Sequence, residues 1–556
     1  MFNRKNFTLL NLFICFAFAI KAQTKVELTK ITNFHQTHRY ELLQEYFSFL
    51  SIPNTGNDPE QLRQNAQFIL KMMEKRGIQG KLLEADGAIP AVYGEILNPK
   101  ATTTIIFYAH YDGQPVTPKN WSAGLEPFKP QLVTDRLDKG GKFIAFPKEN
   151  EVINDDWRIY ARAAADDKAG VFGILNAFYA IKQTELQPNI NIKFFFEGEE
   201  EAGSPNLGKI LEKHKNLLAS DLWVISDGPI HASGRKQIVF GVRGDVNMNL
   251  TVYGAKRPLH SGNYGNWAPN PALKLVQLLA SLKDDKGKVL VDGFYDDVTP
   301  LSAREKDAIK LIPDPSPMMQ RELAFAQTEN PDRSFYESIS ALPTLNINGI
   351  VSANVGKLAA NVIPTTAMAT LDLRLVKGND AERQTQKVIN HIRKQGFFVT
   401  ATEPTDEERA KYPNIITVTN GSGYNAQRTS MDLPLAQRIV KAVQLTSAEP
   451  LVLLPSAGGS LPLFLFETIL KTPPITVPVV NYDNNQHAEN ENLKILFTAL
   501  EKAPRQLGVL LVFLSHSRTG KEVTKKQLLE NEHVNEALLT ALYKKGILEV
   551  YYKEVV

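Results

Sequence analysis

The chain reads TIIFYAHYDG from Thr104 to Gly113, an apolar run of strand length that ends in an imidazole and a carboxylate. Two further apolar runs share this pattern: residues 190–196 (INIKFFF) end at the acidic stretch 197–201, and residues 222–226 (LWVIS) end at Asp227. Helix-spaced apolar residues alternate with these runs, as in βαβ units, and predict an open mixed α/β sheet. Ligands bind at the carboxyl ends of strands in such sheets, so these polar residues are predicted to share one edge.

The periodicity of the chain changes in its middle third. Longer alternating strands, each followed by an amphipathic helix, predict a smaller α+β domain, ferredoxin-like in kind, inserted into the sheet domain. Its strands are expected at 245–253 and 366–376, its helices near 271–282 and 380–394, and short helices such as 303–311 in the polar section 283–343. From Met431 the α/β pattern returns, with a strand at 475–480 and a helix at 490–501. The predicted domains are 23–241 and 429–556 for the sheet domain, the latter ending in a charged helical tail, and 242–428 for the insertion.

The composition is that of a globular protein large enough for several packed units. The chain has 556 residues, 43% of them hydrophobic and 22% charged, which excludes disorder, collagen and coiled coil. Lys and Arg number 63 and Asp and Glu 60, a net charge of +3. Such a balance predicts no nucleic-acid partner and no role at a membrane surface.

The first 22 residues have the features of a secretory signal peptide. Arg4 and Lys5 precede the apolar stretch 7–20, and Ala22 is a small residue at which cleavage is expected. The stretch is shorter than the roughly 20 apolar residues of a membrane span, so we predict a secreted or periplasmic protein, with a retained anchor as the alternative and no stable membrane insertion after cleavage. The only cysteine, Cys15, lies in this leader. The mature protein therefore has no disulfide and no thiolate metal ligand.

Five polar sites follow predicted strands or open a predicted helix. They are His110 with Asp112, the pair Asp166-Asp167, the acidic stretch 197–201, Asp227, and His487. Taken singly, the aspartate pair is explained by helix capping and the acidic stretch by a solvated turn. Together, nitrogen and oxygen ligands without thiolate suit Zn²⁺, Mn²⁺ or Co²⁺, and predict two divalent ions bridged by one aspartate, with a glutamate left over as a base.

Short motifs along the chain resemble those of one enzyme family. They are His110-x-Asp112-Gly113, Ala165-Asp166-Asp167-Lys168, Glu200-Glu201-Ala202-Gly203-Ser204, Ser226-Asp227, His260-Ser261-Gly262, Gly458-Gly459-Ser460 and His487. This set resembles the M20 metallopeptidases, the carboxypeptidase G2, aminoacylase and carnosinase group, and within it the cytosolic dipeptidase and carnosinase branch most. The resemblance runs from roughly Tyr40 to Leu511.

The resemblance implies a role for each residue of the predicted metal centre. Asp166 would bridge two ions, most simply Zn²⁺, with a cis peptide bond between Asp166 and Asp167. The remaining ligands would be His110 and Asp227 on one ion and Glu201 and His487 on the other. Asp112 would orient His110, and Glu200 would be the general base. A slip of one residue within Glu199-Glu200-Glu201 would move the last two roles.

The resemblance also implies residues that contact the substrate. His260 would reach the partner subunit's active site in a homodimer and polarise the scissile carbonyl. Arg374 would clamp the substrate carboxylate, with an ion pair to a neighbouring acid as the structural alternative. Asn361, Gly459 and Ser460 would add hydrogen bonds.

The implied reaction is hydrolysis of an amide bond in a dipeptide or a short peptide with a free C-terminal carboxylate. Water held between the two ions would lose a proton to Glu200 and attack the carbonyl carbon. An N-acyl amino acid deacylase or desuccinylase on the same scaffold is the nearest alternative. A binding protein that has lost catalysis is the other.

Overall fold

The computed structural model describes residues 29–56, 58–421, 423–459 and 461–495. The predicted signal peptide at 1–22, Ser460 and the predicted C-terminal tail lie outside these residues. Within them the chain forms two compact units. Unit 1 comprises residues 29–238, 432–452 and 469–495, and unit 2 comprises residues 239–431 and 453–468.

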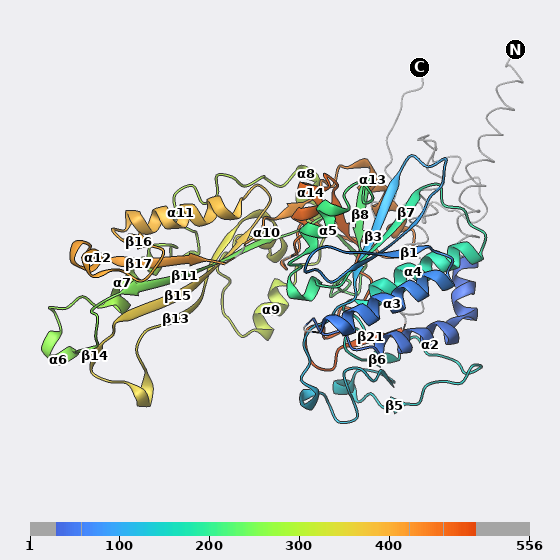
Figure 1. Cartoon of the computed structure of the whole chain (residues 1–556), viewed down its shortest axis with the longest axis horizontal. Coiled ribbons are helices and arrows are strands. Elements are labelled where there is room, and N and C mark those ends of the chain that lie inside the picture. The colour runs from blue at the N-terminus through green and yellow to red at the C-terminus, as the bar shows by residue number, and fades with distance from the viewer. Residues whose placement is uncertain (1–28, 57, 422, 460, 496–556) are drawn as a thin grey trace, which may run out of the picture. The chain divides into compact units, whose positions relative to one another are not determined.

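Unit 1 is built on a mixed sheet whose strand order is β1-β2-β7-β3-β8-β20-β9-β19. The central strands β7, β3, β8 and β20 are parallel, while β1 and β2 pair antiparallel at one side. Figure 1 labels β7, β3 and β8 as neighbours in this sheet. The open mixed α/β sheet predicted from the sequence is therefore confirmed. The bounds are β1 (Gly80–Leu83), β2 (Ala91–Ile96), β3 (Thr104–His110), β7 (Asn191–Glu197), β8 (Leu222–Ile225), β9 (Gln237–Val239), β19 (Val452–Leu454) and β20 (Pro474–Thr476).

The helices of unit 1 begin and end at recognisable sequence signals. In α3 (Pro59–Lys75) the Asp58 side chain accepts hydrogen bonds from the first amides, and Pro59 occupies the first turn, where it needs no donor. Leu62, Ala66 and Ile69 recur on one face and are fully buried. The other helices are α2 (Arg39–Leu50), α4 (Lys168–Gln183), α5 (Leu207–Lys213) and α13 (Pro434–Gln444).

A second, four-stranded sheet in unit 1 corrects one prediction. Its order is β21-β6-β4-β5, with β21 (Asn492–Lys494), β6 (Arg158–Tyr160), β4 (Gln131–Val133) and β5 (Phe143–Ile144). The helix predicted over 490–501 is wrong at 492–494, where the chain pairs antiparallel with β6. Leu493 and Ile495 are both buried, so the apolar residues follow the period of a strand at this point.

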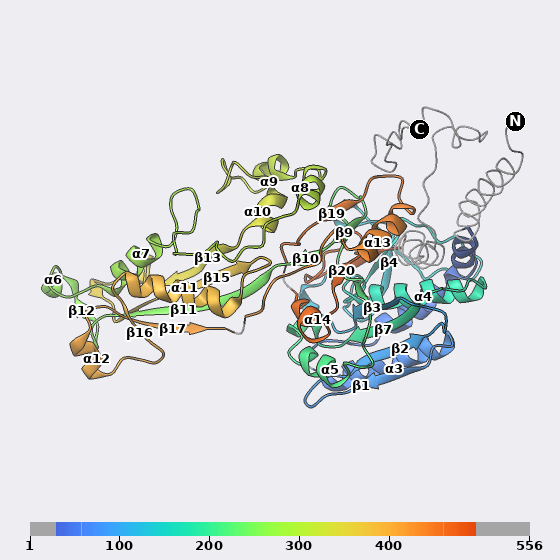
Figure 2. The same ribbon diagram turned by 90° about the horizontal axis from the view of Figure 1, so that it is seen from above.

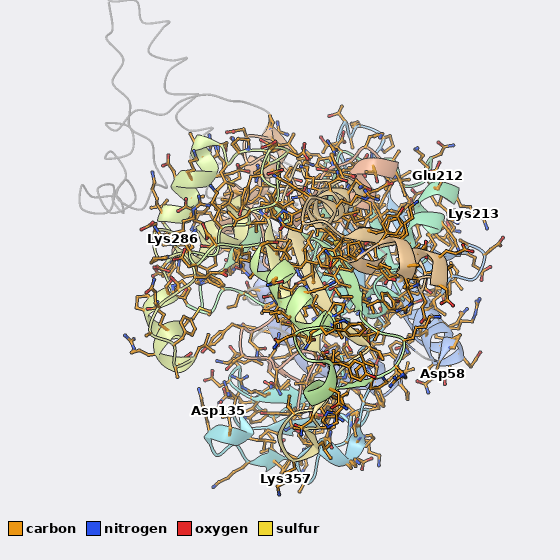
Figure 3. All side chains as sticks on the ribbon, turned by 90° about the vertical axis from the view of Figure 1, so that its left-hand side faces the viewer. Asp58, Asp135, Glu212, Lys213, Lys286 and Lys357 are labelled. Carbon is orange, nitrogen blue, oxygen red and sulfur yellow. The ribbon has the colours of Figure 1, made fainter. Side chains whose placement is uncertain are left out.

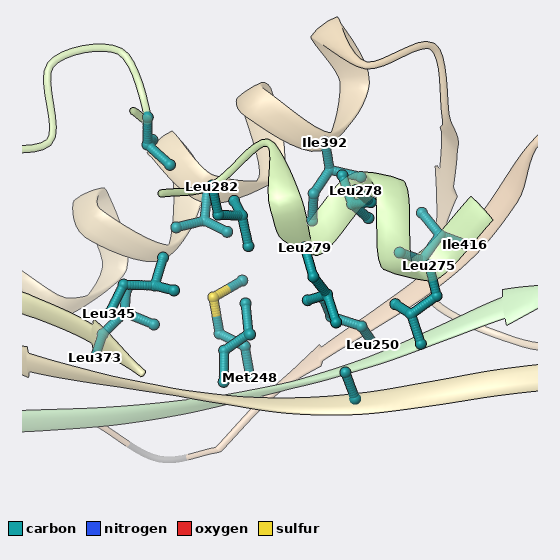
Figure 4. Packing of buried hydrophobic residues seen from close by; sticks show 14 of the residues in the cluster. Met248, Leu250, Leu275, Leu278, Leu279, Leu282, Leu345, Leu373, Ile392 and Ile416 are labelled. Carbon is teal, nitrogen blue, oxygen red and sulfur yellow. The ribbon is translucent and has the colours of Figure 1, made fainter. Parts of the chain in front are cut away.

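Unit 2 is an α+β unit with the sheet order β13-β15-β11-β17-β16. Helices α7 (Pro271–Ala280) and α11 (Ala381–Lys394) cover one face of this sheet. Figure 4 shows Leu275, Leu278 and Ile392 of these helices above Met248 and Leu250 of β11. The strands are β11 (Gly244–Tyr253), β13 (Thr344–Val351), β15 (Thr366–Leu375), β16 (Phe398–Thr400) and β17 (Ile415–Asn420).

Shorter elements complete unit 2 (Figure 2). They are β10 (Gly241–Val242), β12 (Leu259–His260), α6 (Ser261–Tyr264), α8 (Ala303–Lys310), α9 (Ser316–Glu322), α10 (Phe335–Ala341), β14 (Val362–Ile363), α12 (Asp406–Lys411), β18 (Gln427–Arg428) and α14 (Phe464–Ile469). Residues 453–468 were predicted to belong to the sheet domain, whereas the structure groups them with unit 2. Their contacts explain this, because Glu467 pairs with Lys377 and Phe464 stacks on Tyr424.

Charged residues of both signs lie at the surface. Asp135, Glu212, Lys213, Lys286 and Lys357 are exposed, and their side chains project from the periphery in Figure 3. This mixture is the surface counterpart of the nearly balanced net charge.

Leu250→Ala tests the core of unit 2. Leu250 is fully buried under α7 and α11, so the substitution is expected to lower the free energy of unfolding by about 2–5 kcal/mol. Urea unfolding followed by circular dichroism measures it. Leu273→Ala is the control, since Leu273 is 58% exposed and its loss should change stability by less than about 0.5 kcal/mol. Equal effects of the two variants would contradict the packing described here.

Candidate active site

His110 and Asp112 lie at the carboxyl end of β3, and both are fully buried. Asp112 Oδ1 is 3.3 Å from His110 Nδ1. The same carboxylate accepts hydrogen bonds from the backbone N–H of Glu200 (3.1 Å) and Glu201 (2.9 Å), which follow β7. Asp112 therefore links two neighbouring strand ends and leaves Nε2 of His110 facing the other candidate ligands.

The adjacent residues Asp166 and Asp167, at the start of α4, have different contacts. Asp167 caps the helix: its carboxylate accepts from the backbone N–H of Gly170 (3.1 Å) and also from that of His110 (3.2 Å). Asp166 faces the imidazoles, with Oδ1 3.1 Å from His110 Nε2 and Oδ2 3.0 Å from His487 Nε2. The peptide bond between the two aspartates is cis, as the family resemblance implied. A carboxylate with an imidazole at each oxygen has the arrangement that a bridging ligand needs.

Glu200 and Glu201 lie in the 3-10 turn η3 (Glu200–Ala202) that follows β7. Glu200 Oε2 is 3.6 Å from His110 Nε2, whereas Glu201 Oε2 is 3.4 Å from His487 Nε2. The two neighbouring carboxylates therefore approach different imidazoles.

Asp227 and His487 complete the cluster. Asp227 follows β8, and it offers a ligand atom within 4.8 Å of those of His110 and Asp167, just as His110, Asp166 and Glu201 do among themselves. His487 lies in the loop between β20 and β21, and its side chain is 56% exposed, whereas His110 is buried. The structure thus brings all five predicted metal ligands to one edge of the unit 1 sheet.

The electrostatics of the cluster show a surplus of negative charge. Burial raises the pKa of Glu200 well above its ordinary value, and burial with the Asp166 charge raises the pKa of Glu201 to about 7. Burial likewise raises the pKa of Asp227 to about 6. The hydrogen bond to Asp166 raises the pKa of His487 to about 9. Fully ionised, Asp166, Glu200, Glu201 and Asp227 would carry four negative charges against at most two positive charges on His110 and His487.

The donor set fits a pair of divalent cations. Imidazole and carboxylate without thiolate are ligands for Zn²⁺, Mn²⁺ and Co²⁺, and cations would supply the missing positive charge. Asp167 is also close enough to count as a ligand, but both of its oxygens already accept backbone hydrogen bonds. Asp166, with two oxygens directed at two imidazoles, is the better bridging candidate.

Comparison with known proteins assigns the chain to a family. The sequence model described as peptidase family M20/M25/M40 matches residues 106–510, more than half of the chain. The chain belongs to peptidase family M20. Over 415 residues it is 25% identical to the Beta-Ala-His dipeptidase of Homo sapiens, covering 73% of this chain and 74% of that protein. Over 449 residues it is 27% identical to a Cys-Gly metallodipeptidase of Saccharomyces cerevisiae, covering 78% and 85%.

A solved structure agrees with this assignment. An M20 family metallo-carboxypeptidase from Sulfolobus solfataricus matches with a TM-score of 0.67 and 27% identity, and the match covers 85% of this chain and 99% of that one. This M20 protein is therefore a metallopeptidase, and its family depends on dinuclear metal centres.

A second sequence model overlaps the end of the M20 match. It is described as the winged helix domain of the PriA helicase in Bacteroidota, and it matches residues 484–555. Most of that segment lies outside the described residues.

The residues predicted to contact substrate lie in unit 2 of this M20 peptidase. His260 ends β12 and is exposed; its Nδ1 accepts a hydrogen bond from the backbone N–H of Gly262 (3.1 Å). Asn361 is also exposed, and its backbone carbonyl oxygen accepts a hydrogen bond from the backbone N–H of Ser261 (3.0 Å). The structure thus places His260 and Asn361 side by side. Gly459 is exposed in the loop before the undescribed Ser460.

Arg374 forms ion pairs with neighbouring acids, which is the structural alternative to a substrate carboxylate clamp. Its Nε lies 3.1 Å from Asp372 Oδ2 and 3.6 Å from Asp245 Oδ1 within the sheet of unit 2. Its role as a carboxylate clamp stays a prediction.

Two residues that contact the candidate metal ligands were not predicted. Gln114 Nε2 donates to Glu201 Oε2 at 2.7 Å, and its position two residues after Asp112 was the available signal. Glu491 accepts a hydrogen bond from the backbone N–H of Asp166 at 3.0 Å. Its position four residues after His487 was the corresponding signal.

Asp166→Asn tests the bridge. The amide has lost the charge and one acceptor oxygen, so metal affinity should fall by more than the roughly 10–100-fold that removing a ligand's hydrogen-bond partner costs. Metal content after dialysis, measured by plasma mass spectrometry, should drop below that of the parent. Glu212→Gln, an exposed substitution, is the control and should retain the parent's content. Full metal content in Asp166→Asn would remove Asp166 from the ligand set.

Proposed function

We propose that this M20 metallopeptidase hydrolyses dipeptides or short peptides that carry a free C-terminal carboxylate. The relatives' names support this substrate class, since one is a Beta-Ala-His dipeptidase and another a Cys-Gly metallodipeptidase. A panel of dipeptides, tripeptides and N-acyl amino acids, assayed with Zn²⁺ or Mn²⁺, separates this activity from that of a deacylase. Hydrolysis of N-acyl amino acids alone would overturn the proposal.

The position of Glu200 carries the proposed mechanism. Its carboxylate lies beside the candidate ligands, 3.6 Å from His110 Nε2, and its side chain is only 13% exposed. Burial raises its pKa well above the ordinary value, so Glu200 takes up a proton more readily than an exposed glutamate does, as a general base needs. Glu200 would accept the proton of the attacking water and deliver it to the leaving amine.

The other residues of the cluster would hold the metal ions. We assign His110 and Asp227 to one ion, Glu201 and His487 to the other, and Asp166 to both, with Zn²⁺ the first candidate. When bound, such ions polarise a carbonyl oxygen and lower the pKa of water. Asp112 would keep His110 in the orientation that directs Nε2 at its ion.

Glu200→Gln should leave metal content intact and reduce kcat by at least about 10²-fold, because an amide cannot take the proton from water. Metal analysis and steady-state kinetics on the same preparation give both quantities. The matched control is Glu199→Gln, since Glu199 accepts a hydrogen bond from Asn206 at 3.0 Å and is not in the ligand cluster.

The control also reports on the alignment of the three glutamates. Loss of metal from Glu200→Gln, with loss of turnover in Glu199→Gln, would show that base and ligand have each moved by one residue.

We further propose a homodimer in which His260 completes the partner subunit's site. The support is the exposure of His260 and of apolar side chains nearby along β13 and the segment that follows it. Ile350, Val351, Val355 and Leu358 are each more than half exposed, as is expected of a surface that a second subunit covers.

Mixing two inactive variants tests the dimer. His260→Ala and Glu200→Gln should each be inactive alone, and subunit exchange should restore activity, because one hybrid site combines an intact Glu200 with an intact His260. Light scattering and a tagged subunit establish the exchange. No recovery despite exchange, or an active monomer, would return His260 to a role within its own chain.

Secretion and the absence of a nucleic-acid partner also stay proposals. Among the residues that the structure describes, no helix is long and apolar enough to cross a membrane. Amino-terminal sequencing of the exported protein checks cleavage near residue 22. A DNA-binding assay of the full chain checks the absence of a nucleic-acid partner. The assay is needed because residues 484–555 match a winged helix model.

A further inference from the structure

Glu491 is a fully buried carboxylate that lies behind the metal ligands. Its Oε2 accepts from Arg162 Nη1 at 2.7 Å and from the backbone N–H of Ala163 at 3.1 Å. Its Oε1 accepts from the backbone N–H of Ala165 at 2.9 Å and of Asp166 at 3.0 Å. Both oxygens are therefore used, and three of the four donors are backbone amides of one short segment.

This segment connects β6 to α4 and lacks regular structure. Ala163 has a left-handed backbone (φ 60°), which interrupts regular helix or strand pairing. The amide of Ala164 donates to the carbonyl of Ala161 at 3.3 Å, and those of Ala163, Ala165 and Asp166 donate to Glu491. Buried amides without acceptors are costly, and the Glu491 carboxylate supplies the acceptors. On the other side, Tyr46 donates its hydroxyl to the carbonyl of Ala164 at 2.7 Å. Two buried side chains thus fix the backbone that presents Asp166.

Glu491 also belongs to the loop that presents His487. The loop closes at its base, where the N–H of Asn492 donates to the carbonyl of Asn484 at 2.8 Å. The carbonyl of Glu491 itself accepts from the N–H of Ala161 at 3.2 Å. One residue therefore joins the His487 loop to the Asp166 segment through both its side chain and its backbone. The candidate ligands on these two segments, Asp166 and His487, approach each other to 3.0 Å between Oδ2 and Nε2.

We propose that Glu491 is a positioning residue that sets the Asp166 carboxylate against the His487 imidazole and so determines metal affinity. The inference rests on the proposed dinuclear site. The competing explanation is a purely structural one, in which Glu491 serves only to neutralise the buried Arg162, which lies over the Trp121 ring.

Glu491→Gln separates the two explanations. The amide keeps the shape but presents an NH₂ group either to the amides of Ala165 and Asp166 or to Arg162 and Ala163, where donors already lie. We expect metal affinity of the apoprotein to weaken about 10–100-fold, as measured by competition with a chromophoric Zn²⁺ chelator. At saturating Zn²⁺, kcat should fall while KM changes little.

Glu305→Gln is the matched control. Glu305 is also buried and pairs with a buried arginine, Arg428, at 3.1 Å, but it lies in unit 2, which holds none of the five metal ligands. Both variants are expected to lower the melting temperature, and only Glu491→Gln is expected to change Zn²⁺ affinity. Equal melting losses with unchanged Zn²⁺ affinity in both would overturn the proposal.

A second variant keeps the test decisive if Glu491→Gln does not fold. Glu491→Asp retains the charge for Arg162 but is one methylene shorter, so it cannot reach all four donors. Weakened Zn²⁺ affinity in Glu491→Asp supports positioning, and parental affinity contradicts it. Because Zn²⁺ binding needs no substrate, the result stands or falls separately from the proposed peptidase reaction.

Discussion

Negative charge buried at the carboxyl edge of one sheet is the constraint on which the site depends. Parallel strands β3, β7 and β8 lie side by side and end at His110, Glu197 and Ile225, so the residues that follow them share a small volume. Carboxylates so close together repel one another unless hydrogen bonds or cations compensate them. Each carboxylate of the site is therefore placed where a hydrogen-bond donor, an imidazole or a cation could offset its charge.

Different carboxylates are compensated in different ways. Asp112 accepts hydrogen bonds from the backbone amides of Glu200 and Glu201, and so links the ends of β3 and β7. Asp167 accepts hydrogen bonds from the amides of His110 and Gly170, and so links the end of β3 to the start of α4. Glu491 does the same for an irregular segment. Asp166 lies between two imidazoles, and Glu201 and Asp227 lie close to the same cluster, with Gln114 as a further donor to Glu201. These three carboxylates are therefore the groups that cations would neutralise. Aspartate and glutamate thus occur both as structural residues and as candidate metal ligands. The structural ones are recognised by the backbone amides that donate to them.

The sequence was enough to predict both fold and site where an apolar pattern and a ligand-type residue occur in the same stretch. Residues 104–110 are apolar over the length of a strand and end in a ligand type, so both the strand and the site were predictable from one stretch. Family resemblance then separated the adjacent residues Glu200 and Glu201, which spacing alone leaves equivalent. The position of Glu491 four residues after His487 hints at a role in the site, but its partners could not be predicted, because they lie more than 300 residues earlier in the chain. Strand β21 was missed for the same reason, since its three residues extend only because β6 is beside them.

The order of the ligands along the chain has a consequence for biosynthesis. His110, Asp166, Glu201 and Asp227 all precede the inserted unit, whereas His487 follows it. A ribosome therefore synthesises four of the five candidate ligands long before the last one, and all of unit 2 emerges in between. Domains fold as they leave the ribosome, so the acidic edge of the sheet spends that interval without its exposed histidine. A nascent chain that stops short of residue 487 holds the candidate carboxylates and His110 but lacks the fifth candidate ligand.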